Sequence, residues 1–309
     1  MKKISLGIIG CGYITQKAFL PLLTAMPDVS INMILSESSR NWEGIMLSWP
    51  GINTTTNWNE FIDSGIQAAF VLTPVESHFE LCDRLLDEGI HVFVEKPPTT
   101  SAKKTLQIAQ KAQKKNLVFM VGFNRRFAEP VLKTLDIVKE NQIRLIILEK
   151  HRPSQQKRAL AESFREDLIH QVDLLRVFSK ELTPLATSAI EVDGNLLSAV
   201  SNLKMNAHGI GVILHSREAG RWQERVTIIG NEKTLLIDLF QSVAEITADE
   251  KKQIWKAQSE NKWLDDRGFQ KEIIHFLHCI NTNSSPITNG FEAAKTQKLQ
   301  EQLVNLYYA

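Results

Sequence analysis

The residues 91–97, His-Val-Phe-Val-Glu-Lys-Pro, constrain the fold more than any other stretch of the chain. A short apolar, β-branched run bounded by a turn former is typical of a buried strand. Proline cannot continue a sheet ladder, so the strand must end at Pro97 and present Glu95 and Lys96 at its carboxyl end. In open parallel sheets, ligands bind at that edge. We therefore expect the preceding residues to build a cofactor site and the following residues to bring substrate chemistry to Lys96.

Length and composition exclude several classes of protein. A chain of 309 residues is long enough for two domains, and its 43% hydrophobic and 23% charged content is typical of a globular protein. The formal net charge of +1 argues against binding to nucleic acid or membranes through bulk charge. No run approaches the roughly 18 apolar residues of a membrane span. Three separated cysteines, Cys11, Cys82 and Cys279, fit neither a disulfide framework nor a zinc site, which predicts a reducing, cytoplasmic compartment.

The first apolar run, residues 4–9, breaks at once into a glycine turn, so we predict a strand rather than a secretory signal. The pattern Gly-x-Gly-x-x-Thr carries two of the three glycines of a dinucleotide fingerprint, and Thr15 replaces the third. The first glycine permits the turn, the second lets backbone approach a pyrophosphate, and the next helix offers free N–H groups. A plain glycine turn is the alternative. The residues predicted to hold the pyrophosphate are Gly10, Gly12, Tyr13 and Ile14.

The residues after the second predicted strand, 29–35, bear on the choice between NAD and NADP. A carboxylate at the deciding position pairs with the ribose 2′-hydroxyl and repels a 2′-phosphate. If Ser36 occupies that position, Ser38, Ser39 and Arg40 suit a 2′-phosphate. If Glu37 occupies it, NAD is favoured. The pattern leans toward NADP.

The order of elements predicts two domains of different architecture. Strands alternate with helices through residue 122, which favours a Rossmann-type, doubly wound parallel sheet over 1–122. Beyond residue 184, successive strands are joined by short turns, which predicts an α+β domain over 123–309 with a large, open, mostly antiparallel sheet. An open sheet has a broad face and edges to cover, so we expect a homodimer or homotetramer through this sheet. The last helix is predicted to pack on either domain.

Several motifs occur in the order and spacing of a known family. They are Gly10-Cys11-Gly12, Thr73-Pro74 with His78, Glu95-Lys96-Pro97, Gly122 to Phe127, Glu149 to Arg152, His170 to Asp173, His215 to Arg217 and Arg267 to Phe269. With these motifs the chain resembles the Gfo/Idh/MocA oxidoreductases, and most of all their MviM-like branch. The resemblance implies NAD(P)-dependent oxidation or reduction of sugars, inositols and related compounds. It also implies cofactor contacts from Thr73, Pro74, His78, Glu95, Lys96, Pro97 and Asn124.

The resemblance implies a catalytic pair, Lys96 and His170. A histidine can act as general base in alcohol oxidation and as acid in reduction near neutral pH. Lys96 would hydrogen-bond the reacting oxygen and stabilise alkoxide character. His170 and Asp173 are three residues apart on a predicted helix, 163–180, and therefore share a face. Without the resemblance, a surface or structural polar pair is the commoner interpretation.

The residues before His170 depart from the family pattern. The family carries a carboxylate four residues before the histidine and a glycine two before it, where this chain has Glu166 and Leu168. Asp167 could substitute for that carboxylate. Glu166, Asp167 and Asp173 are therefore the candidates for orienting the pair.

A basic cluster is predicted between the two halves of the chain. Its members are Arg125, Arg126, His151, Arg152 and Arg158. Either a structural role or the binding of a carboxylate or phosphate on the substrate fits them, with Arg126 and Arg152 as substrate-binding candidates. His275 and His278 have no third ligand at suitable spacing, so no metal site is predicted.

Two other functions compete with the oxidoreductase. A non-catalytic dinucleotide-binding sensor would keep cofactor affinity without hydride transfer. An NAD-dependent glycosidase would release sugar without net consumption of cofactor.

Overall fold

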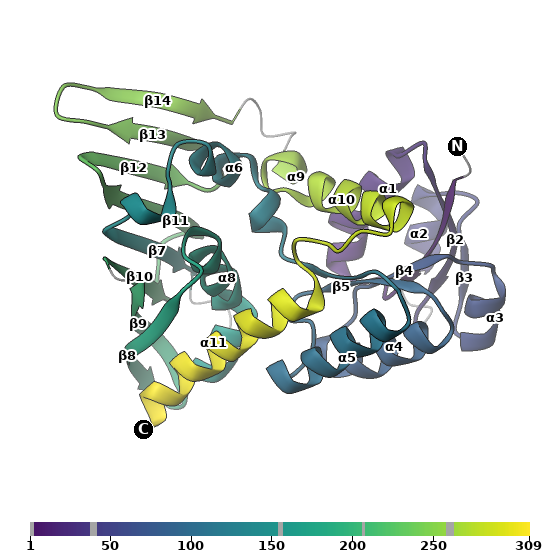
Figure 1. Ribbon diagram of the computed structural model, residues 1–309. Coiled ribbons are helices and arrows are strands. Elements are labelled where there is room, and N and C mark those ends of the chain that lie inside the picture. Colours follow the sequence, from purple (N-terminus) through teal and green to yellow (C-terminus); the bar gives the residue numbers. More distant parts are fainter. Residues whose placement is uncertain (1–2, 38–41, 154–156, 206–207, 258–262) are drawn as a thin grey trace. The chain divides into compact units, whose positions relative to one another are not determined.

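The computed structural model describes residues 3–37, 42–153, 157–205, 208–257 and 263–309 (Figure 1). The chain forms two compact units, residues up to 122 together with 272–294, and residues 123–271 together with 295–309. The predicted second domain, continuous over 123–309, is therefore wrong for residues 272–294. These residues belong to the first unit because Phe276 packs against Phe70 and Phe93, with ring centroids 5.5 and 5.7 Å apart.

The first unit contains a six-stranded parallel sheet of order β3-β2-β1-β4-β5-β6. Its strands are β1 (Ile4–Ile9), β2 (Val29–Leu35), β3 (Asn53–Thr55), β4 (Ala68–Val71), β5 (His91–Glu95) and β6 (Phe119–Gly122). The order reverses between β1 and β4, as in a dinucleotide-binding fold. The predicted doubly wound parallel sheet is confirmed.

Helices connect and cover these strands. They are η1 (Thr15–Phe19, a π-helical turn), α1 (Leu20–Ala25), α2 (Trp42–Ser48), α3 (Trp58–Asp63), α4 (Val75–Asp87), α5 (Ala102–Lys114) and most of α10 (Phe269–Thr282). Figure 1 shows α4 and α5 side by side. The strands β4 and β5 are buried almost throughout, as expected for strands of a parallel sheet that is covered on both faces.

The second unit contains an eight-stranded sheet of order β14-β13-β12-β11-β7-β10-β9-β8. The strands are β7 (Leu145–His151), β8 (Leu182–Val192), β9 (Asn195–Met205), β10 (Gly209–Ser216), β11 (Gln223–Gly230), β12 (Lys233–Asp238), β13 (Ser242–Ile246) and β14 (Lys251–Lys256). Short turns join β8 to β9 and β11 to β12, as predicted, with positive φ at Asp193, Gly194, Asn231 and Glu232.

The sheet is mostly antiparallel, as predicted, but its centre differs from a simple meander. The strand β7 lies between β10 and β11 and pairs with β10 in parallel. The edge strand β14 was not predicted, because its Lys-rich sequence lacks the apolar alternation of a typical strand. Charged residues, lysine above all, are common on such edges because they discourage pairing with other chains.

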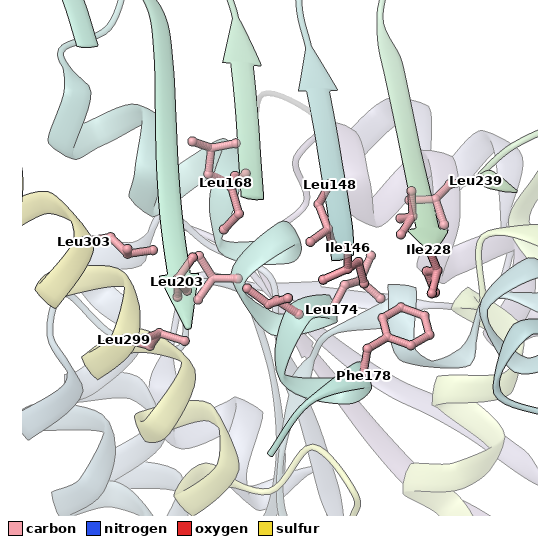
Figure 2. Packing of buried hydrophobic residues seen from close by; sticks show 14 of the residues in the cluster. Ile146, Leu148, Leu168, Leu174, Phe178, Leu203, Ile228, Leu239, Leu299 and Leu303 are labelled. Atoms are coloured by element: carbon pink, nitrogen blue, oxygen red, sulfur yellow. The ribbon is translucent and has the colours of Figure 1, made fainter. Parts of the chain in front are cut away.

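One face of this sheet is covered by α8 (Ile169–Phe178), and Leu299 and Leu303 of α11 (Gly290–Tyr308) join the same core (Figure 2). Ile146 and Leu148 of β7 face this core, at alternate positions of the strand. The remaining helical segments are η3 (Asn124–Phe127), α6 (Glu129–Leu135), η4 (Glu140–Gln142), α7 (Leu160–Ser163), η5 (Phe164–Leu168, a π-helical turn) and α9 (Trp263–Asp266). None of the helices in the described ranges has the length and apolarity that a membrane crossing requires.

Candidate active site

The glycine turn follows β1, where the strand order reverses. Gly10 has φ +97°, and a Cβ there would lie 2.9 Å from the carbonyl oxygen of Leu72, so only glycine fits. The hydroxyl of Thr15 donates to the carbonyl oxygen of Gly10 at 2.9 Å. Thr15 thus ties the helix back to the turn at the position where the fingerprint usually has its third glycine.

The surroundings of Gly12 fit a dinucleotide. A Cβ on Gly12 would meet no atom within 4 Å, which leaves space for a pyrophosphate beside the backbone. Helical structure begins at Tyr13, whose side chain is exposed, and Ile14 follows it in the first turn. The free N–H groups at this helix start are suited to an anion. These four residues would hold the pyrophosphate of a bound cofactor.

The residues predicted to select between NAD and NADP follow β2. The thiol of Cys11 donates to the hydroxyl of Ser36 at 3.1 Å, which places Ser36 beside the glycine turn. Glu37 is exposed. Ser38, Ser39 and Arg40 lie outside the described residues.

The segment after β5 brings Lys96 to the carboxyl edge of the parallel sheet, as the sequence predicts. The Glu95 carboxylate accepts a hydrogen bond from the backbone N–H of Lys96 at 3.0 Å. Glu95 pairs in register with Gly122 of β6, where a Cβ would lie 3.4 Å from the Glu95 carboxyl carbon. A small residue at position 122 therefore leaves room for this carboxylate.

His78 joins two loops at the same edge. Its Nδ1 lies 2.8 Å from the carbonyl oxygen of Pro97, and its Nε2 lies 2.7 Å from that of Thr73. Carbonyl oxygens only accept, so both bonds form together only when the ring carries two protons. Pro74 precedes α4, the helix that carries His78. His78 is buried, and its ring holds the loops around the predicted cofactor residues in place.

In the second unit, His170 lies in the first turn of α8, directly after the π-helical turn η5. Such turns occur frequently at functional sites because they shift the direction of the following side chains. The His170 ring is buried and meets the ring of Phe123 edge-on, with centroids 6.4 Å apart. The predicted helix over 163–180 is present but begins at Leu160 and contains this irregular turn.

The three candidate carboxylates differ in their surroundings. Asp173 accepts two hydrogen bonds from Arg126, both of 2.7 Å. Asp167 receives hydrogen bonds from the side chains of Arg152, Arg158 and Arg217. The carboxylate oxygen Oε1 of Glu166 lies 3.5 Å from Nε of Arg165. The predicted basic cluster is thus largely paired with carboxylates.

Electrostatics keep Asp167 ionised. Burial alone would raise the pKa of this carboxyl, but Lys150, Arg152, Arg158 and a hydrogen bond from Arg217 hold it well below its usual range. Asp167 is therefore an acceptor with a fixed charge, and its carboxylate organises the guanidinium groups around it.

Asn124 uses its side chain within the second unit. Its amide donates to the carbonyl oxygen of Arg267 at 3.0 Å, and its oxygen accepts from Arg125 at 2.9 Å. The predicted contact with the cofactor remains a prediction.

Glu224 and Trp222 also belong to the site, although neither residue was predicted from the sequence. Glu224 is buried, accepts hydrogen bonds from Arg125 at 2.9 and 3.1 Å, and lies 3.3 Å from the ammonium of Lys150. The indole of Trp222 donates to Glu224 at 3.0 Å and faces the guanidinium of Arg152 at 4.3 Å. The sequence does contain a signal for Glu224. It precedes Val226 and Ile228 at alternate positions, so a charged residue occupies a core-facing position of the strand.

No group of potential metal ligands occurs within the described ranges. His275 instead accepts a hydrogen bond from the backbone N–H of Ile287 at 3.0 Å, and its Nε2 lies 3.6 Å from the Cys279 sulfur. These contacts hold the His275 side chain within the first unit.

Comparison with known proteins links this geometry to one family. Residues 4–123 match the family model Gfo/Idh/MocA, described as an oxidoreductase family with an NAD-binding Rossmann fold. The chain is 28% identical over 311 residues to YceM of Salmonella typhimurium, a protein assigned provisionally to the oxidoreductases, with 98% of each chain covered. It is 22% identical over 247 residues to scyllo-inositol 2-dehydrogenase (NAD(+)) of Bacillus subtilis. This match covers 75% of the present chain and 72% of the dehydrogenase.

A solved structure agrees over the full length. The dehydrogenase MviM from Clostridium difficile superposes with a TM-score of 0.92 at 25% identity, covering 98% of this chain and 99% of that one. The glycine turn at the strand-order reversal and the Glu-Lys-Pro segment after β5 are in the parts of the chain that match. Residues 4–123 thus match the Gfo/Idh/MocA oxidoreductases with an NAD-binding Rossmann fold, and similarity to YceM and MviM over 98% of the chain supports a dehydrogenase or reductase.

Proposed function

We propose that the protein catalyses NAD(P)-dependent hydride transfer at a hydroxyl or carbonyl carbon of a small polar substrate, a sugar, cyclitol or related compound. The observation that carries this proposal is Lys96, presented after β5 at the edge of the sheet where the glycine turn lies. Sequence similarity to an inositol dehydrogenase supports the substrate class. When bound, the nicotinamide supplies or accepts the hydride.

Lys96 and His170 have complementary roles in this proposal. The Lys96 ammonium donates a hydrogen bond to the reacting oxygen and stabilises negative charge that develops there. His170 removes the hydroxyl proton during oxidation and returns it during reduction. Glu166 or Asp167 orients His170. Because Asp173 is held by Arg126, we assign Asp173 to anchoring the helix rather than to the proton transfer.

We further propose that the cofactor is NADP. Ser36 beside the glycine turn, followed in sequence by two serines and Arg40, suits a 2′-phosphate. Calorimetric titration with NADP, NADPH, NAD and NADH tests this choice. Tighter binding of the phosphorylated pair, weakened about tenfold by Arg40→Gln, is the expected result. Preference for the unphosphorylated pair, lost in Glu37→Gln, would place Glu37 on the ribose instead.

The catalytic assignment is tested with Lys96→Ala. The variant is expected to lose most turnover in a panel of inositols and sugars, followed by the absorbance of the reduced nicotinamide, while dinucleotide affinity changes little. Lys103→Ala, at an exposed position of α5, is the matched control and should keep full activity. Full activity in Lys96→Ala would refute the role of Lys96.

The same measurements separate the competing functions. A sensor would bind the dinucleotide without hydride transfer to any compound of the panel. A glycosidase would release sugar with no net change in the reduced nicotinamide.

We also propose a reducing, cytoplasmic location. Cys11, Cys82 and Cys279 are buried and form no disulfide among the described residues, as expected for a protein that does not depend on disulfides. Retention of full activity in reductant and recovery of the protein in the cytosolic fraction would support this location.

A further inference from the structure

A row of buried polar groups crosses the helix-covered face of the second unit's sheet. His215 of β10 and Glu224 of β11 both pair in register with Lys150 of β7. All three are at most 3% exposed. The Lys150 ammonium donates to the carbonyl oxygen of Asp167 at 2.8 Å, and the amide of Gln171 donates to Glu224 at 3.5 Å. The row therefore lies against the start of the helix that carries His170.

Next to this row, Arg152 and Arg158 reach solvent, with side chains 32% and 23% exposed. Arg152 uses Nε and Nη2 to contact Asp167 at 3.2 and 3.1 Å. Arg158 uses Nη1 for Asp167 at 3.3 Å and Nε for the exposed Glu162 at 3.2 Å. Within the described ranges, Arg152 Nη1 and Arg158 Nη2 make no hydrogen bond. Both guanidinium groups hold the same carboxylate, Arg152 through Oδ1 and Arg158 through Oδ2.

The surroundings are electropositive. Burial lowers the pKa of Lys150 to about 7; Glu224 opposes this shift, while the charges of Arg125 and Arg152 add to it. Trp222 stacks against Arg152, which limits the rotamers of this side chain and presents its guanidinium in a fixed orientation. A fixed guanidinium pair is suited to the planar or tetrahedral oxygens of a carboxylate or phosphate.

The same row offers a hydrogen-bond acceptor. Burial lowers the pKa of His215 to about 4, so its ring is neutral near pH 7. Its Nδ1 donates to the carbonyl oxygen of Lys150, which leaves Nε2 with a lone pair. This buried Nε2 has no partner among the described residues. An acceptor of this kind matches a hydroxyl donor on a ligand.

We propose that Arg152 and Arg158 form an anion subsite that takes a carboxylate or phosphate group of the substrate, with His215 accepting a hydrogen bond from one of its hydroxyls. The substrate is then an anionic polyol, such as a sugar acid or a sugar phosphate. This inference rests on the proposed function in assigning the second unit to substrate binding. Asp167 organises the subsite and Trp222 fixes the position of Arg152.

The test is calorimetric titration of the full chain with inorganic phosphate and, separately, with acetate, at constant ionic strength. Saturating dinucleotide is present, so that the glycine turn does not offer a second phosphate site. We expect saturable binding of at least one anion, weakened about tenfold in Arg152→Gln and in Arg158→Gln. Tighter phosphate binding identifies a phosphorylated substrate, and tighter acetate binding identifies a sugar acid.

Arg225→Gln is the matched control, because Arg225 is exposed and follows Glu224 on the opposite face of the same strand. Equal anion affinity in Arg225→Gln and Arg152→Gln, or no saturable binding to the wild type, would overturn the subsite. If Arg152→Gln does not fold, Arg158→Gln decides, because it leaves the contact between Arg217 and Asp167 intact. Failure of the proposed function would show separately, as absence of dinucleotide binding. In that case the anion titration is run without dinucleotide, and it still compares the anion affinities of the wild type and the variants.

Discussion

Arg126 and Asp173 form a two-point ion pair, in which Nε donates to Oδ2 and Nη2 to Oδ1, both at 2.7 Å. The hydroxyl of Thr296 donates to the same Oδ1 at 2.9 Å. Asp173 is 1% exposed and lies three residues after His170. The pair thus fixes α8 to the turn η3 and to α11, and through α8 it fixes the position of His170.

Breaking this pair should destabilise the second unit. Asp173→Asn removes the counter-charge that Asp173 supplies to the largely buried Arg126 guanidinium, so we expect the free energy of unfolding to fall by about 3 kcal/mol. Urea denaturation followed by circular dichroism measures the change. Asp136→Asn, at an exposed position, is the control and should change stability by less than about 0.5 kcal/mol. Equal unfolding free energies for both variants would contradict the anchoring role of Asp173.

The buried ammonium of Lys150 should make stability depend on pH. Its pKa is about 7 in the folded chain, against an ordinary value of 10.5, because burial outweighs the attraction of Glu224 and because Arg125 and Arg152 add positive charge. Between these values the unfolded state binds more protons than the folded state, so this lysine makes stability rise with pH from about 7 to about 10. The contribution is up to about 1.4 kcal/mol per pH unit.

Lys150→Met should remove this dependence. We expect the difference in unfolding free energy between the wild type and Lys150→Met to grow in favour of the wild type as pH rises from 7 to 9. Lys204→Met, at an exposed position of β9, should leave the pH profile of the wild type unchanged. Parallel pH profiles for the wild type and Lys150→Met would show that the folded lysine titrates as it does in the unfolded chain.

Much of the architecture could be predicted because its signals are local. The apolar runs of β1, β4 and β5 end in glycine or proline, which marks both the strand and the edge where Gly10 and Lys96 lie. The hairpin turns at Asp193-Gly194 and Asn231-Glu232 are similarly encoded by neighbouring residues.

The remainder depends on contacts between distant residues. The insertion of β7 between β10 and β11 joins segments more than 60 residues apart, for which no local pattern exists. The π-helical turn before His170 and the sharing of Asp167 by three arginines are likewise set by tertiary packing. The basic cluster was visible in the sequence, but its pairing with Asp167, Asp173 and Glu224 was not.

Gly268 should be intolerant of any side chain. Its φ is +86°, and a Cβ would lie 2.3 Å from the carbonyl oxygen of Asn124 and 2.6 Å from the backbone nitrogen of Ala128. Because these neighbours are backbone atoms, they cannot move aside cheaply, and Gly268→Ala should cost about 3 kcal/mol or more of unfolding free energy. Gly220→Ala, where a Cβ meets nothing within 4 Å, should change stability by less than about 1 kcal/mol. Similar denaturation midpoints for the two variants would contradict the close packing at Gly268.

The face of the eight-stranded sheet opposite α8 should bind a second copy of the chain. Large apolar side chains are exposed along it on several strands, including Val200, Ile210, Ile229 and Leu236, with exposed fractions of 37–48%. A patch of this kind on a sheet face is typical of a protein interface. We therefore expect a homodimer or homotetramer in solution.

The double variant Ile210→Lys, Leu236→Lys should dissociate this oligomer, because two buried ammonium groups without partners outweigh the apolar contacts they replace. Light scattering coupled to size exclusion measures the mass, and Leu47→Lys, at an exposed position in the first unit, is the control. A monomeric wild type would show that the face remains open to solvent.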